Sequence, residues 1–157
     1  MTTPLDVLGV ADALASQLAT VTLGTAVAGG TAIHGSTARS PNAIPETPYV
    51  VVLLPSSDSV DQSTYGQMRI THEFPVEFLL SRATGDDAID NEARLAWLGP
   101  LLWGLESHNT LNLGLPVLKA WVTAYAPDTV SYDSVDYIAW RLTISVWTQS
   151  SYQPVAT

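Results

Sequence analysis

The stretch Gln67–Leu80 constrains the fold most, because apolar and polar residues alternate along it with one exception. Side chains of an extended strand point alternately to opposite faces, so each set of residues would share one face. The mostly apolar face would carry Met68, Ile70, His72, Phe74, Val76, Phe78 and Leu80. The other face would carry Arg69, Thr71, Glu73, Pro75 and Glu77, and Leu79 interrupts its polar pattern. The pattern predicts a long, half-buried β-strand that needs neighbouring strands and a covering layer.

Four other stretches predict further strands. Tyr137–Trp147 repeats the alternation, and Val117–Tyr125 shows it more weakly. Ala126–Asp136 lies between them and holds proline and aspartates, so we expect an antiparallel hairpin with a long loop. Tyr49–Leu54 is a continuous apolar run, which is typical of a strand buried on both faces. Val21–Ile33 is rich in β-prone residues and predicts a short additional strand.

A first helix is predicted at the start of the chain. Thr3 is the expected N-cap, Pro4 the first helical residue, and Asp6 lies in the first turn, where the helix dipole favours a negative charge. Apolar residues then recur at three- and four-residue steps, at Leu8, Ala11, Leu14, Leu18 and Val21. We expect this helix to run to about Thr20 and to cover one face of the sheet.

A second helix is predicted after the organising strand. Asp86 or Asp87 can cap it, and an apolar stripe follows at helical spacing: Ile89, Ala93, Ala96, Trp97 and Leu101, broadened by Leu95, Leu98, Leu102 and Leu105. Gly99-Pro100 falls inside this pattern and should kink or break the helix, because proline removes a backbone donor. Asn109–Gly114 is expected to end it.

Together these elements predict one α+β domain over residues 1–157, with the order α-β-β-β-α-β-β along the chain. Strands without βαβ alternation favour a largely antiparallel sheet with the two main helices packed on one face. The polar segment 56–66 is expected to be a flexible loop or a contact arm. Residues 150–157 are expected to form a C-terminal tail.

Composition limits the possible functions. Charged residues make up 13% of the chain, about half the usual share, and fifteen acidic residues against six basic ones give a net charge of −9. Such a chain should not bind nucleic acid or anionic membranes through its charge, although DNA could pass through a ring without being gripped. The low charge suggests that a partner covers part of the surface; the alternative is a polar but uncharged surface. The uncharged stretch Ala13–Ala38 has too few large apolar residues to span a membrane.

The residue pattern offers no catalytic or metal site. The chain has no cysteine, and its three histidines, His34, His72 and His108, are scattered without metal-ligand spacing. The acidic group at Asp86, Asp87, Asp90 and Glu92 is what a helix N-terminus favours in any case. No nucleophile elbow, phosphate-binding loop or dinucleotide fingerprint is present in the sequence. We therefore expect neither enzymatic activity nor a cofactor.

Tryptophan is the more informative residue type. Trp121 and Trp147 fall on the less apolar faces of their strands, which Tyr125 and Arg141 share. Tryptophan, tyrosine and arginine are enriched in interface hot spots. These four residues are the candidates for an interface, although the two tryptophans could also lie beneath a second layer.

The layout resembles that of tail terminator (tail completion) proteins of long-tailed bacteriophages. The resemblance rests on the first helix, a β-region ending in Tyr49–Pro55, the strand Met68–Leu80, the helix from Asp86 and the closing strand Tyr137–Trp147. It implies a ring, typically a hexamer, at the head-proximal end of the tail tube in the virion, assembled in the host cytoplasm. The ring would stop tube polymerisation, contact the tail tube protein and the head-side connector, and let DNA pass through its lumen. The family has no catalytic residues.

Three alternatives remain open at this stage. The chain could be another neck component, such as a head-closure or adaptor protein. It could instead be a small-molecule binding domain or enzyme with a pocket between the sheet and the second helix, in which His72 and Glu77 would be the suspected residues. A monomeric accessory domain is the third alternative.

Overall fold

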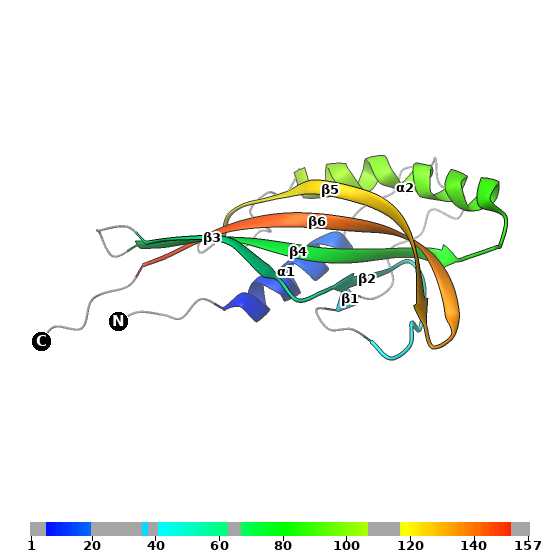
Figure 1. Cartoon of the computed structure of the whole chain (residues 1–157), viewed down its shortest axis with the longest axis horizontal. Coiled ribbons are helices and arrows are strands. Elements are labelled where there is room, and N and C mark those ends of the chain that lie inside the picture. Colours follow the sequence, from blue (N-terminus) through cyan, green and yellow to red (C-terminus); the bar gives the residue numbers. More distant parts are fainter. Residues whose placement is uncertain (1–5, 20–35, 38–40, 63–66, 107–116, 152–157) are drawn as a thin grey trace, which may run out of the picture.

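The computed structural model describes residues 6–19, 36–37, 41–62, 67–106 and 117–151 (Figure 1). It confirms the α+β class, with two helices and a largely antiparallel sheet in the described ranges. The elements in chain order are α1 (Val7–Ala19), β1 (Ser36–Thr37), β2 (Tyr49–Val52), β3 (Ser56–Gln62), β4 (Gln67–Arg82), α2 (Asp87–Glu106), β5 (Val117–Tyr132) and β6 (Val135–Ser151). The predicted strand within Val21–Ile33 lies outside the described residues. The other predicted helices and strands are observed in the predicted order.

The sheet is built around β4 and β6, which pair along almost their whole length. Its order is β1-β2-β4-β6-β5, and β1 alone runs parallel to its neighbour. Both β2 and β3 pair with the same edge of β4, β2 with Val76–Leu79 and β3 with Met68–Glu73. Between them the Leu53 N–H donates to the Pro75 carbonyl at 2.9 Å. The two short strands are therefore two parts of one interrupted strand.

Residues 56–66 were predicted to be a flexible loop or a contact arm, and the loop alternative is wrong for residues 56–62, which form β3. Polar residues can occupy this strand because it lies at the sheet edge, where backbone hydrogen bonds to β4 hold it and Val60 is exposed. In Figure 1 the ends of β3 and β4 extend beyond both helices as a projecting arm. Residues 63–66 lie outside the described ranges.

The prediction of a long loop between the last two strands is also wrong. β5 continues to Tyr132, and only Asp133 and Ser134 form the turn before β6. Both turn residues have positive φ, 51° and 63°, which is the geometry of a two-residue hairpin turn whose twist suits the flanking strands. Pro127 is tolerated within β5 because β5 is an edge strand, where a missing N–H breaks no ladder bond. β6 also takes in Ser150 and Ser151 of the predicted tail, and residues 152–157 are outside the described ranges.

Both helices pack on one face of the sheet, as predicted. The main core joins the buried side of α1 and α2 to the predicted apolar face of β4 and to alternate residues of β6. Its largest fully buried side chains are Phe74, Phe78, Leu14, Leu18, Leu101, Ile138, Leu142 and Ile144. Val50, Val51 and Val52 are all fully buried, which confirms a strand buried on both faces. A smaller core on the opposite face joins Val51 and Leu79 to Tyr137 and Ala139 near the hairpin turn.

The helix ends follow the predicted chemistry with two corrections. Asp6 precedes α1 as its N-cap, since its Oδ1 accepts the Gly9 N–H at 2.9 Å, while Thr3 and Pro4 lie outside the described residues. Asp86 caps α2 by accepting the Ala88 N–H at 3.0 Å. The predicted break at Pro100 does not occur, and α2 continues to Glu106. Gly99 removes one of the obstacles, because a residue without Cβ avoids part of the clash that disfavours the helical conformation before proline.

Helix α2 is tied to the β5 edge by specific polar contacts. Arg94 donates from Nη2 to the Asp128 carbonyl at 2.9 Å and to Thr129 Oγ1 at 3.1 Å. Trp140 Nε1 donates to the Arg94 carbonyl at 2.7 Å. Asp90 is buried and accepts the Thr84 hydroxyl at 2.8 Å. The acidic group at the start of α2 thus has structural roles at Asp86 and Asp90.

Candidate functional site

The sheet face opposite the helices carries three of the four predicted interface residues, Trp121, Trp147 and Arg141. Tyr125 lies on the helix side instead, where it packs edge-on against Trp140 with ring centroids 5.7 Å apart. A β-bulge between Val122 and Ala124 shifts the register of β5 by one residue. Such a shift turns every later side chain to the other face, which strict alternation in the sequence cannot indicate.

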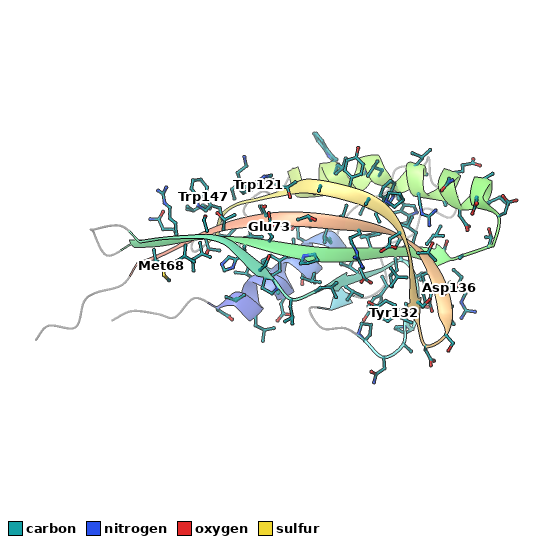
Figure 2. The ribbon with its side chains drawn as sticks, viewed as in Figure 1. Met68, Glu73, Trp121, Tyr132, Asp136 and Trp147 are labelled. Atoms are coloured by element: carbon teal, nitrogen blue, oxygen red, sulfur yellow. The ribbon has the colours of Figure 1, made fainter. Side chains whose placement is uncertain are left out.

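Trp121 and Trp147 lie close together on neighbouring strands, away from the hairpin turn (Figure 2). In the register, Trp147 faces Lys119 and Trp121 faces Ser145, so the two tryptophans are diagonal neighbours. The Lys119 ammonium lies 5.2 Å from the Trp121 ring centroid, and the Arg69 guanidinium lies 5.1 Å from that of Trp147. Both pairs have the geometry of cation–π contacts. Each indole is half-buried.

We call this part of the sheet the open face. In the described part of the chain, no helix lies on it, and its side chains come from the middle strands β4 and β6 and from β5. It comprises Arg69, Thr71, Glu73, Lys119, Trp121, Thr143, Ser145 and Trp147, of which Ser145 is buried at its base. The surface is mixed, with two large aromatic rings, hydroxyl groups, two cations and one carboxylate. Such a composition is typical of protein interfaces, in which aromatic residues and arginine are enriched.

A polar cluster adjoins the open face toward the hairpin turn. Glu77 is 5% exposed and accepts the Tyr132 hydroxyl at 2.9 Å and Arg141 Nη2 at 3.4 Å. Arg141 Nε also lies 3.4 Å from Asp128 Oδ2. Burial, and then the hydrogen bond to Glu77, raises the pKa of Tyr132 well above its usual range. The cluster joins strands β4, β5 and β6, so Arg141 helps to hold the hairpin in place. Its side chain is nevertheless half-exposed.

His72 has a structural environment on the helix side. It is buried, and its Nε2 lies 3.2 Å from Thr148 Oγ1. The Thr148 hydroxyl donates its proton to the Ile70 carbonyl at 3.3 Å, so His72 is the donor in the first contact. Burial lowers the pKa of His72. These contacts fit a neutral, hydrogen-bonded histidine of the core.

The pair suspected in the pocket alternative is not brought together. His72 lies on the helix side of β4, whereas Glu77 lies on the opposite side. Between α2 and the sheet, Phe78 and Trp97 are in ring contact at 5.4 Å, and Leu101 is fully buried. His72 and Glu77 therefore cannot act on one ligand between the sheet and α2.

The sequence pattern missed the outer surface of α2. Ile89 and Leu95 were expected on the buried stripe, but they are 55% and 69% exposed, and Trp103 is 69% exposed. The buried side of α2 carries Trp97 and Leu101 of the predicted stripe, together with Asp90. The spacing of the residues already indicated this, because Leu95 and Trp103 fall on the opposite side of a 3.6-residue helix from Trp97 and Leu101, and Ile89 falls beside that buried face.

Neither a metal site nor a membrane-spanning helix is found among the described residues. In those ranges no three His, Cys, Asp or Glu side chains gather closely enough to hold an ion. The described helices are also not apolar over a length that could cross a bilayer. Comparison with known proteins adds no assignment: no protein-family model matches the chain, and no curated protein matches it significantly.

Proposed function

We propose that this chain is a structural virion protein, a tail terminator of a long-tailed bacteriophage. It forms a hexameric ring at the head-proximal end of the tail tube, ends polymerisation of the tube and presents a surface to the head-side connector. In this proposal it needs no catalytic residue and no cofactor. It is assembled in the host cytoplasm and resides at the neck of the virion.

The open face is the observation that carries the proposal. One face of the sheet is closed by two helices, while the other presents Trp121 and Trp147 beside Arg69 and Lys119. A sheet face with large aromatic side chains is suited to burial against another protein surface. The α+β layout on which the resemblance was based supports the same assignment.

The charge distribution bears on how DNA would pass. The net charge of −9 suits a lumen that DNA slides through without binding. Arg69, Lys119 and Arg141 are half of the six basic residues, and all lie on the sheet side away from the helices. We therefore expect this side to lie in subunit contacts rather than along the channel. A ring map with a strongly basic channel would contradict this arrangement.

Solution mass and electron microscopy test the proposal. Light scattering after size exclusion should give about six times the 16.8 kDa subunit mass, and micrographs of the same fraction should show rings. If the chain is monomeric alone, it should still cap tail tubes at one end and shorten them when added during polymerisation. A monomer that ignores tail tubes would overturn the proposal. Binding to the connector without any effect on tubes would indicate another neck component.

A further inference from the structure

We propose that the outer surface of α2 in one subunit packs on the open face of the next subunit, so that the ring closes by a helix-on-sheet contact. The occupant of the open face is thus a second copy of this chain. The inference rests on the proposed ring and specifies which two surfaces build it.

The first surface is a narrow apolar strip, which we call the α2 ridge. Ile89, Glu92, Leu95, Gly99 and Trp103 follow each other at three- and four-residue steps, so they share one side of the helix. All five are exposed, and within the described ranges no atom outside the helix backbone around Gly99 lies within 4 Å of the place where its Cβ would be. At 1.5 Å per residue, the ridge is about 21 Å long. Gly99 in its middle lets another backbone or a large side chain approach closely.

The second surface matches the ridge in length. Along β6 the open face and the adjoining Arg141 extend from Arg141 to Trp147, which is roughly 20 Å at the usual rise of a strand. Thr143 and Ser145 are short side chains in the middle of this row, and Trp121 and Trp147 stand near one end. A helix about 10 Å wide covers two strands, so it could lie along β6 between the neighbouring side chains of β4 and β5.

The charges of the two surfaces are complementary. The ridge carries Glu92, and Asp87 lies at its N-terminal end, while no basic residue belongs to the ridge. The open face carries Lys119 and Arg69 against one carboxylate, Glu73. Arg69 Nε already donates to Gln149 Oε1 at 3.3 Å, so Lys119 is the cation best placed to meet an acidic neighbour. Opposite charges of this kind favour pairing of unlike surfaces over pairing of like ones.

The two surfaces cannot satisfy each other within one molecule. The α2 ridge points away from the sheet, since the opposite side of the helix packs on the core through Trp97 and Leu101. The open face is on the far side of the same sheet. Each copy can therefore use both surfaces at once. Repetition of such a head-to-tail contact builds a closed ring when the rotation between copies closes.

Disulfide trapping tests the contact directly, because the chain has no cysteine of its own. A chain with both Leu95→Cys and Thr143→Cys, oxidised under conditions of assembly, should give a ladder of covalent species up to the ring order. Chains with either change alone should give dimers at most. The matched control pairs Thr143→Cys with Leu8→Cys, an exposed leucine of α1, and should give no ladder. A ladder from the control as strong as that from the test pair would overturn the proposal.

Charge reversal supplies the second measurement. Lys119→Glu and Glu92→Lys should each weaken ring assembly at least tenfold, and the two together should restore it to within about threefold. Asp12→Lys on the exposed side of α1 changes the charge equally and should leave assembly unaltered. Suppose that wild-type rings form, that neither charge reversal weakens their assembly and that the cysteine pair gives no ladder. The proposed contact is then overturned, but the proposed ring is not. If the wild-type chain forms no ring, alone or on tail tubes, the proposed function fails as well. The inference would also be overturned if the cysteine at position 143 cross-linked to the tail tube protein and not to a second copy of this chain.

Discussion

On the face covered by the helices, β4 and β6 contribute apolar side chains that are almost completely buried, whereas on the open face the same two strands contribute charged, hydroxyl and aromatic side chains. Phe74 and Ile144 represent the first face, and Glu73 and Trp147 the second. On the helix side, these strands make polar contacts between His72 and Thr148 and from Trp140 Nε1 to the Arg94 carbonyl. On the other side, polar contacts join Glu77, Tyr132 and Arg141.

The two faces therefore stabilise the fold by different interactions, apolar burial on one and polar contacts on the other. Burial of apolar area involves no titratable group, so the stability of the helix side should depend on pH only through the buried His72. The hydrogen bonds and ion pairs of the other side depend on protonation, and those of exposed groups depend on salt. The sheet can therefore keep one face constant while the other remains available to a partner. The following variants test this division, from the largest expected effect to the smallest.

Phe78→Ala should cause the largest loss of stability. Phe78 is fully buried and in ring contact with Trp97, so its removal leaves a cavity between the sheet and α2. We expect the free energy of unfolding to fall by about 3–5 kcal/mol, measured by urea unfolding of the monomeric fraction. Ile89→Ala on the α2 ridge is the control and should cost no more than about 0.5 kcal/mol. Equal losses for both would show that the helix side is not the main core.

Glu77→Ala should cause an intermediate loss on the other side of β4. It removes the acceptor of the Tyr132 hydroxyl and one partner of Arg141. A partly buried donor left without its acceptor costs about 1–3 kcal/mol, again measured by urea unfolding. Glu73→Ala is a matched control on the same strand and the same face, and should change stability little. A loss at Glu73 as large as that at Glu77 would remove the distinction between the polar cluster and the open face.

The sequence predicted the helix side better than the open face, for a physical reason. Burial imposes a period of two on a strand, and the apolar set Phe74, Val76, Phe78 and Leu80 is accordingly found on the buried face. Edge pairing imposes no such pattern, because it uses backbone groups only. The strand β3, with its polar sequence, was therefore missed.

The candidate interface was predicted only in part, because local irregularities decide the side on which a residue lies. The bulge after Val122 turned Tyr125 to the helix side, and no alternation in the sequence marks such a bulge. Ile89 and Leu95 were assigned to the core of α2 because an apolar residue does not by itself indicate burial. Trp121 and Trp147 lie on the face that the alternation predicted, since Trp121 precedes the bulge after Val122 and the register of β6 is unbroken around Trp147.

Stability of the helix side should depend on pH through His72. Because burial lowers the pKa of His72 from 6.5, the unfolded chain binds a proton at a higher pH than the folded chain does. The contribution of neutral His72 to the free energy of unfolding is therefore complete above about pH 6.5. It is lost as the pH falls toward the pKa of the folded chain, by at most about 1.4 kcal/mol per pH unit. His72→Gln keeps a nitrogen donor for Thr148 and does not titrate. Unfolding curves at several pH values should show a smaller acid loss for this variant, and identical profiles would contradict the expectation.

Tyr132→Phe should have the smallest effect near neutral pH and should reveal the other side at high pH. The change removes one hydroxyl and its bond to Glu77, which costs about 0.5–1.5 kcal/mol. Burial raises the pKa of Tyr132 above its usual 10.0, so below that pH both states keep the proton and stability does not vary with it. As the pH rises past 10.0, the unfolded chain ionises first and the wild-type protein loses stability. The phenylalanine variant lacks this part of the loss, so the stability difference between the two proteins should shrink with increasing pH. A constant difference would show that Tyr132 ionises equally in both states, and that the hairpin is not held to β4 by a buried hydroxyl.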